Sequence, residues 1–502
     1  MSEVRTRFAP SPTGFLHIGG LRTALYNYLF AKKNKGKFVL RIEDTDRERY
    51  VKGSEKQIIN SLLWADLNYD EGPRINNQGQ LEPGDNQFGP YIQSKRLELY
   101  ANFAEDLIDK GLAYRCYCSK QRLEDLRKKQ MAARLAPKYD RYCLNNKPSG
   151  KKYVIRFKIP EEGTTGWRDL VHDKVKFDNK ILEDFVMMKQ DGLPTYNFAN
   201  VIDDHLMKIS DVIRGEEFLS STPKHLLLYR ALGWPTPQFA HIPLILGKNK
   251  AKLSKRDGDV AVDDYFKKGY LPDALINFVA LLGWNPGTDQ EILDREALIY
   301  KFSLKQINKS NAIFDLDKLD WMNGCYIRQR NPEDLTREAV PFLIKAKFLK
   351  ITQKNGYINP KNKEVIYFDD LKKIIRLEQG RMKKLSELPE LIDFVFVDKL
   401  KYDPSLLIWK KMTKKELREG LTIISQYLNT FPEKNFTAEK LDNKIKELIK
   451  EKNLGTGETL WPMRVALSGK AASPGPFEIA EILGKTKTVS RINDALKLSA
   501  GL

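Results

Sequence analysis

The sequence predicts a multidomain α/β protein whose C-terminal region is all-α. The 502 residues are more than one compact domain usually holds. Near the N-terminus, strand, loop, helix and strand patterns follow one another, which is typical of a βαβ unit. Beyond Arg328 the chain changes to lysine-rich amphipathic patterns with helical spacing, and these predict a region built of helices.

The βαβ unit begins with a predicted strand at 4–8, which Pro10, Pro12 and Gly14 end by forcing an irregular loop. A helix is predicted from near Gly19, because apolar residues recur along one stripe at Leu21, Ala24, Leu25, Tyr28 and Leu29. The apolar run 38–43 that follows is typical of a buried parallel strand.

His17, Gly19 and Gly20 fall at the N-terminus of this predicted helix. Such a terminus offers unpaired backbone N–H groups and a positive dipole end, and glycines let a phosphate approach the backbone closely. His17 could add a hydrogen bond to that anion. Taken alone, the same residues also fit a proline-rich turn before an ordinary surface helix, because short glycine motifs are weak evidence.

A second segment, 248–256, is crowded with basic side chains between Gly247 and Gly258, which predicts a loop. A solvated run of charge is the ordinary explanation of such a cluster. However, the strand-like run 241–246 followed by Lys-Leu-Ser-Lys at 252–255 resembles the second signature of class I aminoacyl-tRNA synthetases. In that class the final lysine of the signature meets the ATP phosphates.

Six motifs together resemble those of bacterial glutamyl-tRNA synthetases, which are class I enzymes: 9–14, 17–20, 41–46, 89–94, 214–217 and 252–256. Further matches at 318–323, 464–469 and 474–477 extend the resemblance over essentially the whole chain. Gly20 stands where many synthetases have a second histidine, and glutamyl enzymes commonly carry a small residue there. The resemblance implies ATP-dependent attachment of L-glutamate to tRNA(Glu) through a glutamyl-adenylate.

The resemblance also implies a domain order. It comprises a Rossmann-like catalytic domain with an acceptor-binding insertion, then an all-α anticodon-binding region. We expect the first half of the catalytic domain at 1–97, the connective acceptor-binding insertion at 98–194, the second half of the catalytic domain at 195–246, the ATP loop and stem-contact domain at 247–327, and the anticodon-binding region at 328–502.

Local patterns place elements within these domains. The insertion should hold a helix at 120–134 and a strand at 152–159, and the resumed catalytic fold a strand at 208–213. Thr222 as N-cap and Pro223 at the first helical position predict a helix through 226–232.

The C-terminal region carries its own helix signals. Thr413 and Glu416 form a capping-box pattern ahead of an apolar stripe. Further helices are expected at 335–347, 368–377, 441–449 and 478–498. Without the upstream motifs, a helical scaffold or oligomerisation module would explain this region equally well. With them the resemblance implies anticodon recognition, and it singles out Arg464 as a base reader because a guanidinium recognises base edges in a defined geometry.

Matches to the family's substrate positions give the candidate site. The glutamate-binding candidates are Arg7, Ala9, Ser11, Glu43, Tyr196, Asn200 and Arg214. The catalytic candidates are His17 and Lys255, and the ATP-binding candidates are Gly19, Gly20, Lys252, Ser254 and Lys255. The resemblance implies that Arg7 and Tyr196 hold the γ-carboxylate, Arg214 faces the α-carboxylate and Glu43 receives the ammonium. It further implies that His17 serves the α-phosphate and that Lys255, with Lys252, serves the pyrophosphate leaving group. Mg²⁺ is expected with ATP.

Three of the four cysteines, Cys116, Cys118 and Cys143, resemble the zinc cluster of some family members. A structural zinc normally needs four ligands. Many zinc-bearing relatives have a histidine two residues after the third cysteine, where this chain has Asn145. Tyr139 is the candidate fourth ligand, because some close paralogues use a tyrosine four residues before the last cysteine. Plain thiols are the alternative, and the isolated Cys325 is expected to be a packing residue.

The chain carries 85 Lys or Arg against 66 Asp or Glu, a formal charge of +19, and this favours a polyanionic partner. Charge alone does not distinguish RNA from DNA or an anionic membrane. With neither a run of eighteen apolar residues nor a signal-peptide pattern, the sequence predicts a soluble cytosolic protein without membrane association. Four cysteines are too few for a disulfide framework in a chain of this length, and a monomer is expected because no long heptad seam demands a dimer.

Three other functions fit parts of this sequence. Glutaminyl-tRNA synthetases usually read Pro-Pro-Glu-Pro-Asn-Gly at the position of 9–14 and carry a β-barrel anticodon region. A truncated paralogue that glutamylates a modified tRNA base lacks a helical C-terminal region. A noncatalytic RNA-binding protein would have no need to keep His17, Glu43 and Lys255. Whether the chain also charges tRNA(Gln) is left open by the sequence.

Overall fold

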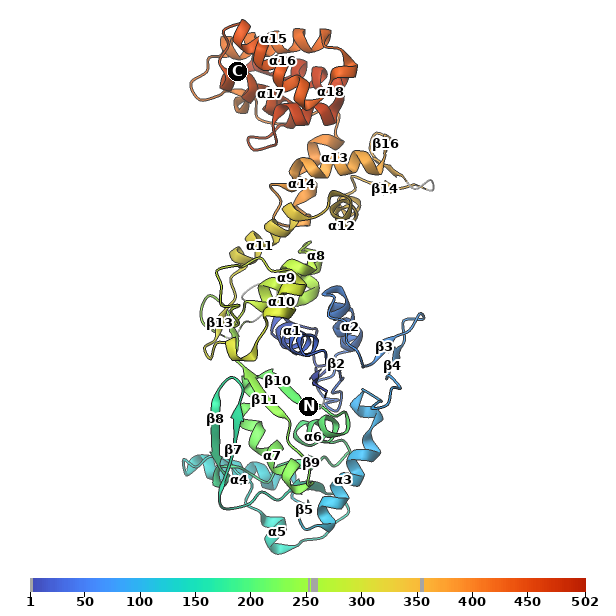
Figure 1. Cartoon of the computed structure of the whole chain (residues 1–502), viewed down its shortest axis with the longest axis vertical. Helices are drawn as coiled ribbons and strands as arrows, with labels where there is room; N and C mark the ends of the chain where they lie inside the picture. The colour runs from blue at the N-terminus through green and yellow to red at the C-terminus, as the bar shows by residue number, and fades with distance from the viewer. Residues whose placement is uncertain (1–2, 252, 254–260, 353–355) are drawn as a thin grey trace. The chain divides into compact units, whose positions relative to one another are not determined.

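The computed structural model describes residues 3–251, 253, 261–352 and 356–502. The chain divides into two compact units (Figure 1). The first comprises Met1–Phe266 and Pro272–Leu319, and the second comprises Lys267–Leu271 and Asp320–Leu502. Within the described ranges, no helix is both long and apolar enough to cross a membrane.

A six-stranded sheet organises the first unit, in the order β2 (Lys37–Leu40), β1 (Arg5–Phe8), β10 (Asp211–Gly215), β11 (Gln238–Ile242), β7 (Thr164–Asp169) and β8 (Asp173–Asp178). Neighbouring strands are parallel from β2 to β7, and β8 returns antiparallel to β7 as a hairpin. Strand β1 pairs with β2 along one edge and with β10 along its other edge, so the strand order reverses direction at β1. In such open sheets, ligands bind beyond the carboxyl ends of the strands at this reversal of order.

Helices surround this sheet, and the predicted apolar stripe of the first one, Leu21 to Leu29, is buried as expected. The helices of the first unit are α1 (Ile18–Lys33), α2 (Ser54–Trp64), α3 (Leu97–Asp109), α4 (Lys120–Ala132), α5 (Tyr142–Asn146), α6 (Tyr196–Leu206), α7 (Thr222–Ala231), α8 (Val262–Lys267), α9 (Pro272–Ala280) and α10 (Arg295–Lys301). Apolar side chains of α3, α6 and α7 share one core with the insertion strands and with Val212 of β10.

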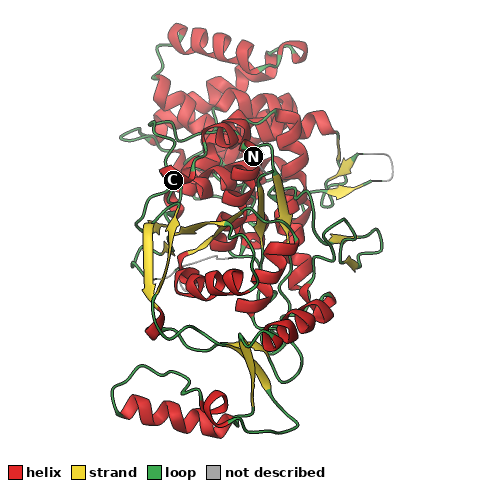
Figure 2. Cartoon of the chain, turned by 60° about the horizontal axis from the view of Figure 1, so that its bottom comes forward, coloured by secondary structure: helices red, strands yellow, loops and turns green. Residues whose placement is uncertain are grey.

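An antiparallel sheet of β5 (Ala113–Cys116), β6 (Val154–Phe157) and β9 (Val186–Met188) lies in the predicted insertion, together with α4 and α5 (Figure 2). The predicted helix and strand of this region are therefore present with shorter bounds. Two small ladders complete the first unit: β3 (Arg74–Ile75) with β4 (Leu81–Glu82), and β12 (Ile245–Leu246) with β13 (Ala312–Ile313).

The second unit is mainly helical. Its helices are α11 (Leu316–Gln329), which begins in the first unit, α12 (Pro332–Lys345), α13 (Phe368–Gln379), α14 (Leu388–Ile392), α15 (Lys414–Thr430), α16 (Ala438–Glu451), α17 (Thr456–Ser468) and α18 (Pro476–Leu498). Thr413 and Glu416 form the predicted capping box, and Leu417, Leu421 and Ile424 are buried in the helical core. A small sheet of β14 (Lys350–Ile351), β15 (Tyr357–Ile358) and β16 (Val365–Ile366) interrupts the helices, so the region predicted as all-α is mainly helical but also contains short strands.

Several predicted bounds shift for local reasons. Lys208 has a left-handed φ of 57°, so the expected strand at 208–213 begins only at Asp211. The expected strand at 241–246 is two strands separated at Pro243, which cannot donate to a ladder. Ser221 is the N-cap of α7, and Thr222, predicted in that role, is already helical. Helix α17 was not predicted, because Pro462 lies inside it and a proline usually ends or breaks a helix.

Candidate active site

A cavity of about 1110 Å³ lies beyond the carboxyl ends of β1, β2 and β10. The size suits substrates larger than one amino acid, because pockets for small molecules usually measure about 300–1,000 Å³. The predicted catalytic residue His17 and two predicted ATP-binding residues, Gly19 and Gly20, line it. So does every predicted glutamate-binding residue: Arg7, Ala9, Ser11, Glu43, Tyr196, Asn200 and Arg214. The structure thus brings residues from distant parts of the chain together, and their individual roles remain predictions.

The N-terminus of α1 opens onto this cavity. His17 is its N-cap, and His17 Nδ1 accepts a hydrogen bond from the backbone N–H of Gly20 at 3.1 Å. A Cβ added at Gly20 would lie 2.9 Å from Leu16 Cδ1, and one added at Gly19 would lie 3.0 Å from His17 Cε1. A side chain at either position would push Leu16 or His17 aside, whereas glycine leaves the helix terminus open to an anion.

Lys252, Ser254 and Lys255, the predicted residues of the basic signature, lie outside the described residues. The described residues around them do reach the site. Leu253 lines the cavity, and Ala261 forms an antiparallel backbone bridge with His17.

Glu43 is held in the cavity wall by hydrogen bonds to only one of its oxygens. Oε1 accepts from Arg41 Nη2 at 2.9 Å and from Asn200 Nδ2 at 3.1 Å. No hydrogen-bond partner for Oε2 is found in the described part of the chain. Burial raises the pKa of Glu43, and the Arg41 guanidinium opposes that change. One carboxylate oxygen therefore remains for a cationic ligand group.

Arg7 is neutralised by Asp204 on α6. Arg7 Nε donates to Asp204 Oδ1 at 3.0 Å, and Nη2 donates to Oδ2 at 3.3 Å. Arg41 Nη1 donates to the same Oδ1 at 2.8 Å. Although burial opposes ionisation, the two guanidinium groups lower the pKa of Asp204, so it remains a carboxylate. Asp204 thereby fixes both arginines while leaving Arg7 Nη1 without a hydrogen bond to any described residue.

Arg214, at the end of β10, differs because all its partners are neutral. Its Nη1 donates to the Tyr196 hydroxyl at 3.0 Å and to His225 Nδ1 at 3.2 Å, and its Nε donates to His241 Nε2 at 3.1 Å. Its Nη2 donates to Thr222 Oγ1 at 2.8 Å and contacts the Phe218 carbonyl. Within the described ranges, no carboxylate forms an ion pair with this side chain, which is only 4% exposed.

A second carboxylate on α6, Asp203, anchors the wall behind this site. It accepts hydrogen bonds from Arg96 Nε, Gln93 Nε2 and the Tyr100 hydroxyl, each at 2.8 Å. It also lies 3.8 Å from Arg41 Nε. These contacts tie α6 to the segment that leads into α3 and hold the Arg41 side chain from behind.

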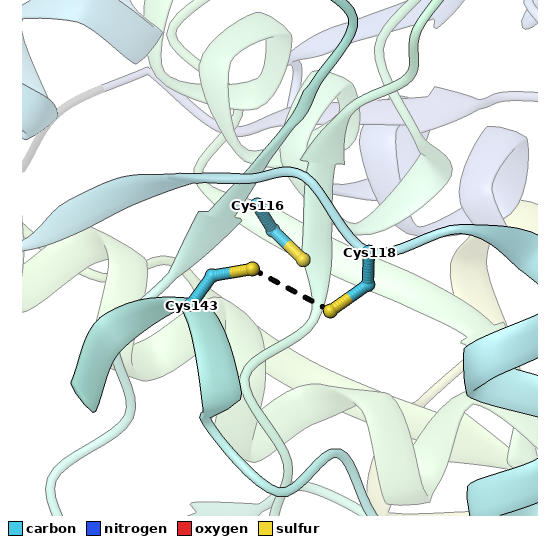
Figure 3. A group of neighbouring side chains, drawn as sticks. All are labelled: Cys116, Cys118 and Cys143. Atoms are coloured by element: carbon cyan, nitrogen blue, oxygen red, sulfur yellow. Dashed lines mark hydrogen bonds between the residues drawn. The ribbon is translucent and has the colours of Figure 1, made fainter. Parts of the chain in front are cut away.

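The three cysteines predicted as metal ligands form a cluster in the insertion, where their Sγ atoms point toward one another within 4.8 Å (Figure 3). Cys118 Sγ lies 3.4 Å from Cys143 Sγ. The Tyr139 hydroxyl lies 3.3 Å from Cys116 Sγ and 3.6 Å from Cys118 Sγ. The predicted fourth ligand therefore faces the thiols, whereas Cys325 lies in the second unit.

Arg464, the predicted base reader, lies on α17 in the second unit. Its Cζ sits 4.4 Å from the centre of the Trp461 ring, and its Nη2 donates to the Ala471 carbonyl at 2.8 Å. Its Nε is buried without a hydrogen-bond partner in the described part of the chain. The guanidinium is thus stacked on an aromatic face and retains donor capacity.

Comparisons with known proteins identify this arrangement. The family described as tRNA synthetases class I (E and Q), catalytic domain, matches residues 3–321, and an anticodon binding domain matches 334–496. A glutamate–tRNA ligase of Dehalococcoides mccartyi is 45% identical over 497 residues, covering 99% of this chain and 97% of that protein. The chain belongs to the glutamate–tRNA ligase family. The family assignment and the fold class predicted from the motifs are confirmed.

Other glutamate–tRNA ligases support this placement. The enzyme of Clostridium botulinum is 44% identical over 507 residues, covering 99% of both chains. The solved structure of the glutamate tRNA ligase from Elizabethkingia meningosepticum, in complex with its amino acid, superposes with a TM-score of 0.83. It is 35% identical in sequence and covers 99% of each chain.

Sequence reasoning missed the residues that support the ligase site from behind. Asp203 and Asp204 are adjacent acids that directly follow the apolar pair Val201 and Ile202, and this position was the available signal of buried ion pairs. Arg41 was noticed only as part of a motif. The roles of His225 and His241 could not be predicted from the sequence, because the residues next to a histidine in the chain do not reveal which distant side chain it contacts.

Proposed function

We propose that this chain attaches L-glutamate to tRNA(Glu) in two ATP-dependent steps through a glutamyl-adenylate. One observation supports the choice of an acidic amino acid: Arg214 is a buried cation without an anionic partner among the described residues. The charged side chains around Arg7 and Arg41 are paired with one another: Arg7, Arg41 and Arg96 against Glu43, Asp203 and Asp204. The further buried carboxylate, Asp169, reaches Arg214 only through the ring of His241 and forms no ion pair with it. A carboxylate of glutamate would give the Arg214 guanidinium the direct anionic partner that the described residues do not supply.

We assign the ends of glutamate by their charge. The ammonium would meet Glu43 Oε2, the oxygen left over by Arg41 and Asn200. Arg214 would face the α-carboxylate. The γ-carboxylate would take hydrogen bonds from Arg7 Nη1 and from the Tyr196 hydroxyl, whose proton is available because its oxygen accepts from Arg214. Burial raises the pKa of Tyr196, so the phenol remains a donor.

ATP would place its phosphates at the N-terminus of α1, where Gly19 and Gly20 leave the backbone accessible. His17 holds this terminus through its bond to Gly20 and would face the α-phosphate. Lys252, Ser254 and Lys255 remain proposed partners of the pyrophosphate leaving group. Mg²⁺ would accompany the ATP phosphates, since the cysteine cluster is the only group of three or more metal-ligating side chains in the described part of the chain.

The chemistry consists of two displacements. The α-carboxylate oxygen of glutamate attacks the α-phosphorus and pyrophosphate leaves. The terminal ribose hydroxyl of the tRNA then attacks the activated carbonyl and AMP leaves. Neither step requires a nucleophile from the protein, so the side chains act by position and charge. Arg214 and Glu43 orient the amino acid, and the helix terminus stabilises the growing negative charge on phosphate oxygens.

The insertion would hold the acceptor end of the tRNA, and we propose that zinc stabilises it. With Zn–S bonds of about 2.3 Å, tetrahedral sulfurs lie about 3.8 Å apart. The Sγ atoms of Cys118 and Cys143 lie 3.4 Å apart and all three Sγ atoms lie within 4.8 Å of one another, so a small shift of the thiols would accommodate the ion. Cys116, Cys118, Cys143 and Tyr139 would be the ligands. Metal analysis should find zinc in the wild type and lose it in Cys143→Ser, whereas Cys325→Ser should retain it. A metal-free wild-type protein would exclude the site.

Anticodon bases would stack near Trp461 and be recognised by Arg464, because aromatic faces and guanidinium groups are the usual partners of unstacked RNA bases. We further propose that the chain acts as a monomer in the cytoplasm.

The function is tested by ATP–pyrophosphate exchange with tRNA(Glu) present. Glutamate should support exchange, whereas glutamine and aspartate should not. Charging tRNA(Glu) and tRNA(Gln) side by side then defines the range of tRNA substrates. Exchange that is independent of glutamate, or absent with every amino acid, would refute the proposal.

A further inference from the structure

A buried acid–histidine pair lies behind Arg214 and outside the cavity lining. Asp169 ends β7, and His241 lies on the neighbouring strand β11. Both side chains are 0% exposed, and Asp169 Oδ2 lies 2.6 Å from His241 Nδ1. Neither residue lines the cavity, so neither can touch a substrate there directly.

The surroundings of Asp169 determine which ring nitrogen of His241 carries the proton. Oδ1 accepts from the backbone N–H groups of Val171, His172 and His241 at 3.0, 3.1 and 3.2 Å. Oδ2 accepts from Trp167 Nε1 and faces His241 Nδ1. Burial raises the pKa of Asp169, but the hydrogen bond with His241 and then the backbone hydrogen bonds from His172 and Val171 lower it to about 2, so Asp169 is a carboxylate that only accepts. His241 Nδ1 must therefore donate.

Nε2 of His241 then carries no proton and can only accept hydrogen bonds. Burial, reinforced by the Arg214 charge, lowers the pKa of His241 to about 4, which keeps the ring neutral near neutral pH. Its Nε2 takes the Arg214 Nε–H at 3.1 Å and lies 3.0 Å from Thr222 Oγ1. Asp169 is thus linked to Arg214 through one neutral ring with a defined tautomer.

We propose that Asp169 and His241 are positioning residues for amino-acid binding. Asp169 locks His241 with its proton on Nδ1, and His241 Nε2 in turn holds the Arg214 guanidinium in the orientation that receives the substrate carboxylate. This inference rests on the proposed function, because it requires Arg214 to bind glutamate. The Nε–H anchors the plane of the guanidinium, and the neutral ring does so without cancelling the charge that the ligand needs.

Asp169→Asn tests the tautomer directly. The amide oxygen should take the Oδ1 position, because the reverse orientation would set the amide nitrogen against three backbone donors. The amide nitrogen then faces His241 Nδ1, which can accept only if the ring proton moves to Nε2. Nε2–H would then meet the Arg214 Nε–H, donor against donor.

The expected result is a glutamate KM raised at least about tenfold in Asp169→Asn, with the ATP KM within about threefold of wild type. Asp169→Ala should raise the glutamate KM less, because it leaves His241 free to keep its proton on Nδ1. A merely structural role predicts the reverse order, since alanine leaves the three backbone donors unpaired. That reverse order, or an unchanged glutamate KM in Asp169→Asn, would overturn the inference.

A second pair of variants, at His241, tests the inference even if the Asp169 variants fail to fold. His241→Gln can still present an oxygen to Arg214 and should retain a glutamate KM closer to wild type than His241→Leu, which cannot accept. His205→Leu is the matched control, because His205 stacks on Trp234 at 3.8 Å instead of contacting Arg214. Equal effects of the glutamine and leucine substitutions would also overturn the inference.

The tautomer itself can be observed, since the chain has only five histidines. With ¹⁵N-labelled histidine, NMR of the wild type should show an unprotonated Nε2 for His241, identified by its loss in His241→Gln. In Asp169→Asn that nitrogen should become protonated, and retention of the wild-type tautomer would overturn the inference. A wild-type chain without glutamate-dependent exchange would instead refute the proposed function, so the two failures are distinguishable.

Discussion

Replacing Glu43 by glutamine should separate recognition of the ammonium group from the rest of glutamate binding. All three hydrogen bonds to this carboxylate fall on Oε1, from Arg41 Nε and Nη2 and from Asn200. The amide oxygen of Glu43→Gln can accept the same bonds, so the wall of the cavity should survive. Its NH₂ group then takes the place of Oε2 and presents a donor to the substrate ammonium, which is also a donor.

The size of the effect follows from the kind of contact that is lost. Removing one partner of a buried, hydrogen-bonded charge pair costs about 2–5 kcal/mol. The lower end applies here because Oε1 keeps its bonds, and about 2 kcal/mol corresponds to a glutamate KM raised roughly 30-fold. The assay is tRNA-dependent ATP–pyrophosphate exchange at varied glutamate concentration.

Glutarate, which has both carboxylates of glutamate but no ammonium, provides the control. Its inhibition constant against glutamate should not weaken in Glu43→Gln, because the loss of one buried negative charge does not disfavour a dianion. Glu43 does not bind the ammonium group if the glutamate KM of Glu43→Gln stays within about threefold of wild type, or if glutarate binding weakens by the same factor as glutamate binding.

Three further predictions concern stability and the helix terminus. The pKa of His241 is about 4 when folded against 6.5 normally, so the unfolded chain takes up the proton first as pH falls. The free energy of unfolding of the wild type, measured by urea titration, should therefore fall by about 3 kcal/mol between pH 6.5 and pH 4. That of His241→Gln should fall by less over the same interval. Leu421→Ala should lower the calorimetric stability of the helical unit by about 2–5 kcal/mol, against about 0.5 for the exposed Lys415→Ala on the same helix. His17→Ala should slow pyrophosphate exchange at least about tenfold, and a wild-type rate would remove His17 from the mechanism.

Local patterns predicted the elements that depend on neighbouring residues. The α1 stripe and the Thr413 capping box were predicted because period and capping are properties of a few consecutive positions. Helix α17 was missed, since Pro462 lies within it and the local pattern gave no sign that tertiary packing would maintain the helix.

The candidate site was predicted as a set of residues but not as a network. The motifs gathered Arg7, Glu43 and Arg214 around one cavity, and the structure places them there. Their pairing could not be predicted, because Asp204 joins Arg7 and Arg41 from a helix that follows a long insertion. Similarly, His241 meets Asp169 only because β11 and β7 are neighbours in the sheet.

The carboxylate shared by Arg7 and Arg41 also constrains how the chain is made. Asp204 follows Arg7 by 197 positions and Arg41 by 163. At ribosomal rates of about 5–20 residues per second, the first arginine leaves the ribosome about 10–40 s before its counter-ion. Arg41 can pair early with Glu43, but until α6 emerges Arg7 has no carboxylate partner and must remain hydrated, so β1 cannot take its final buried place. The ribosome must therefore synthesise the whole insertion before the N-terminal strand β1 can be buried in its final position.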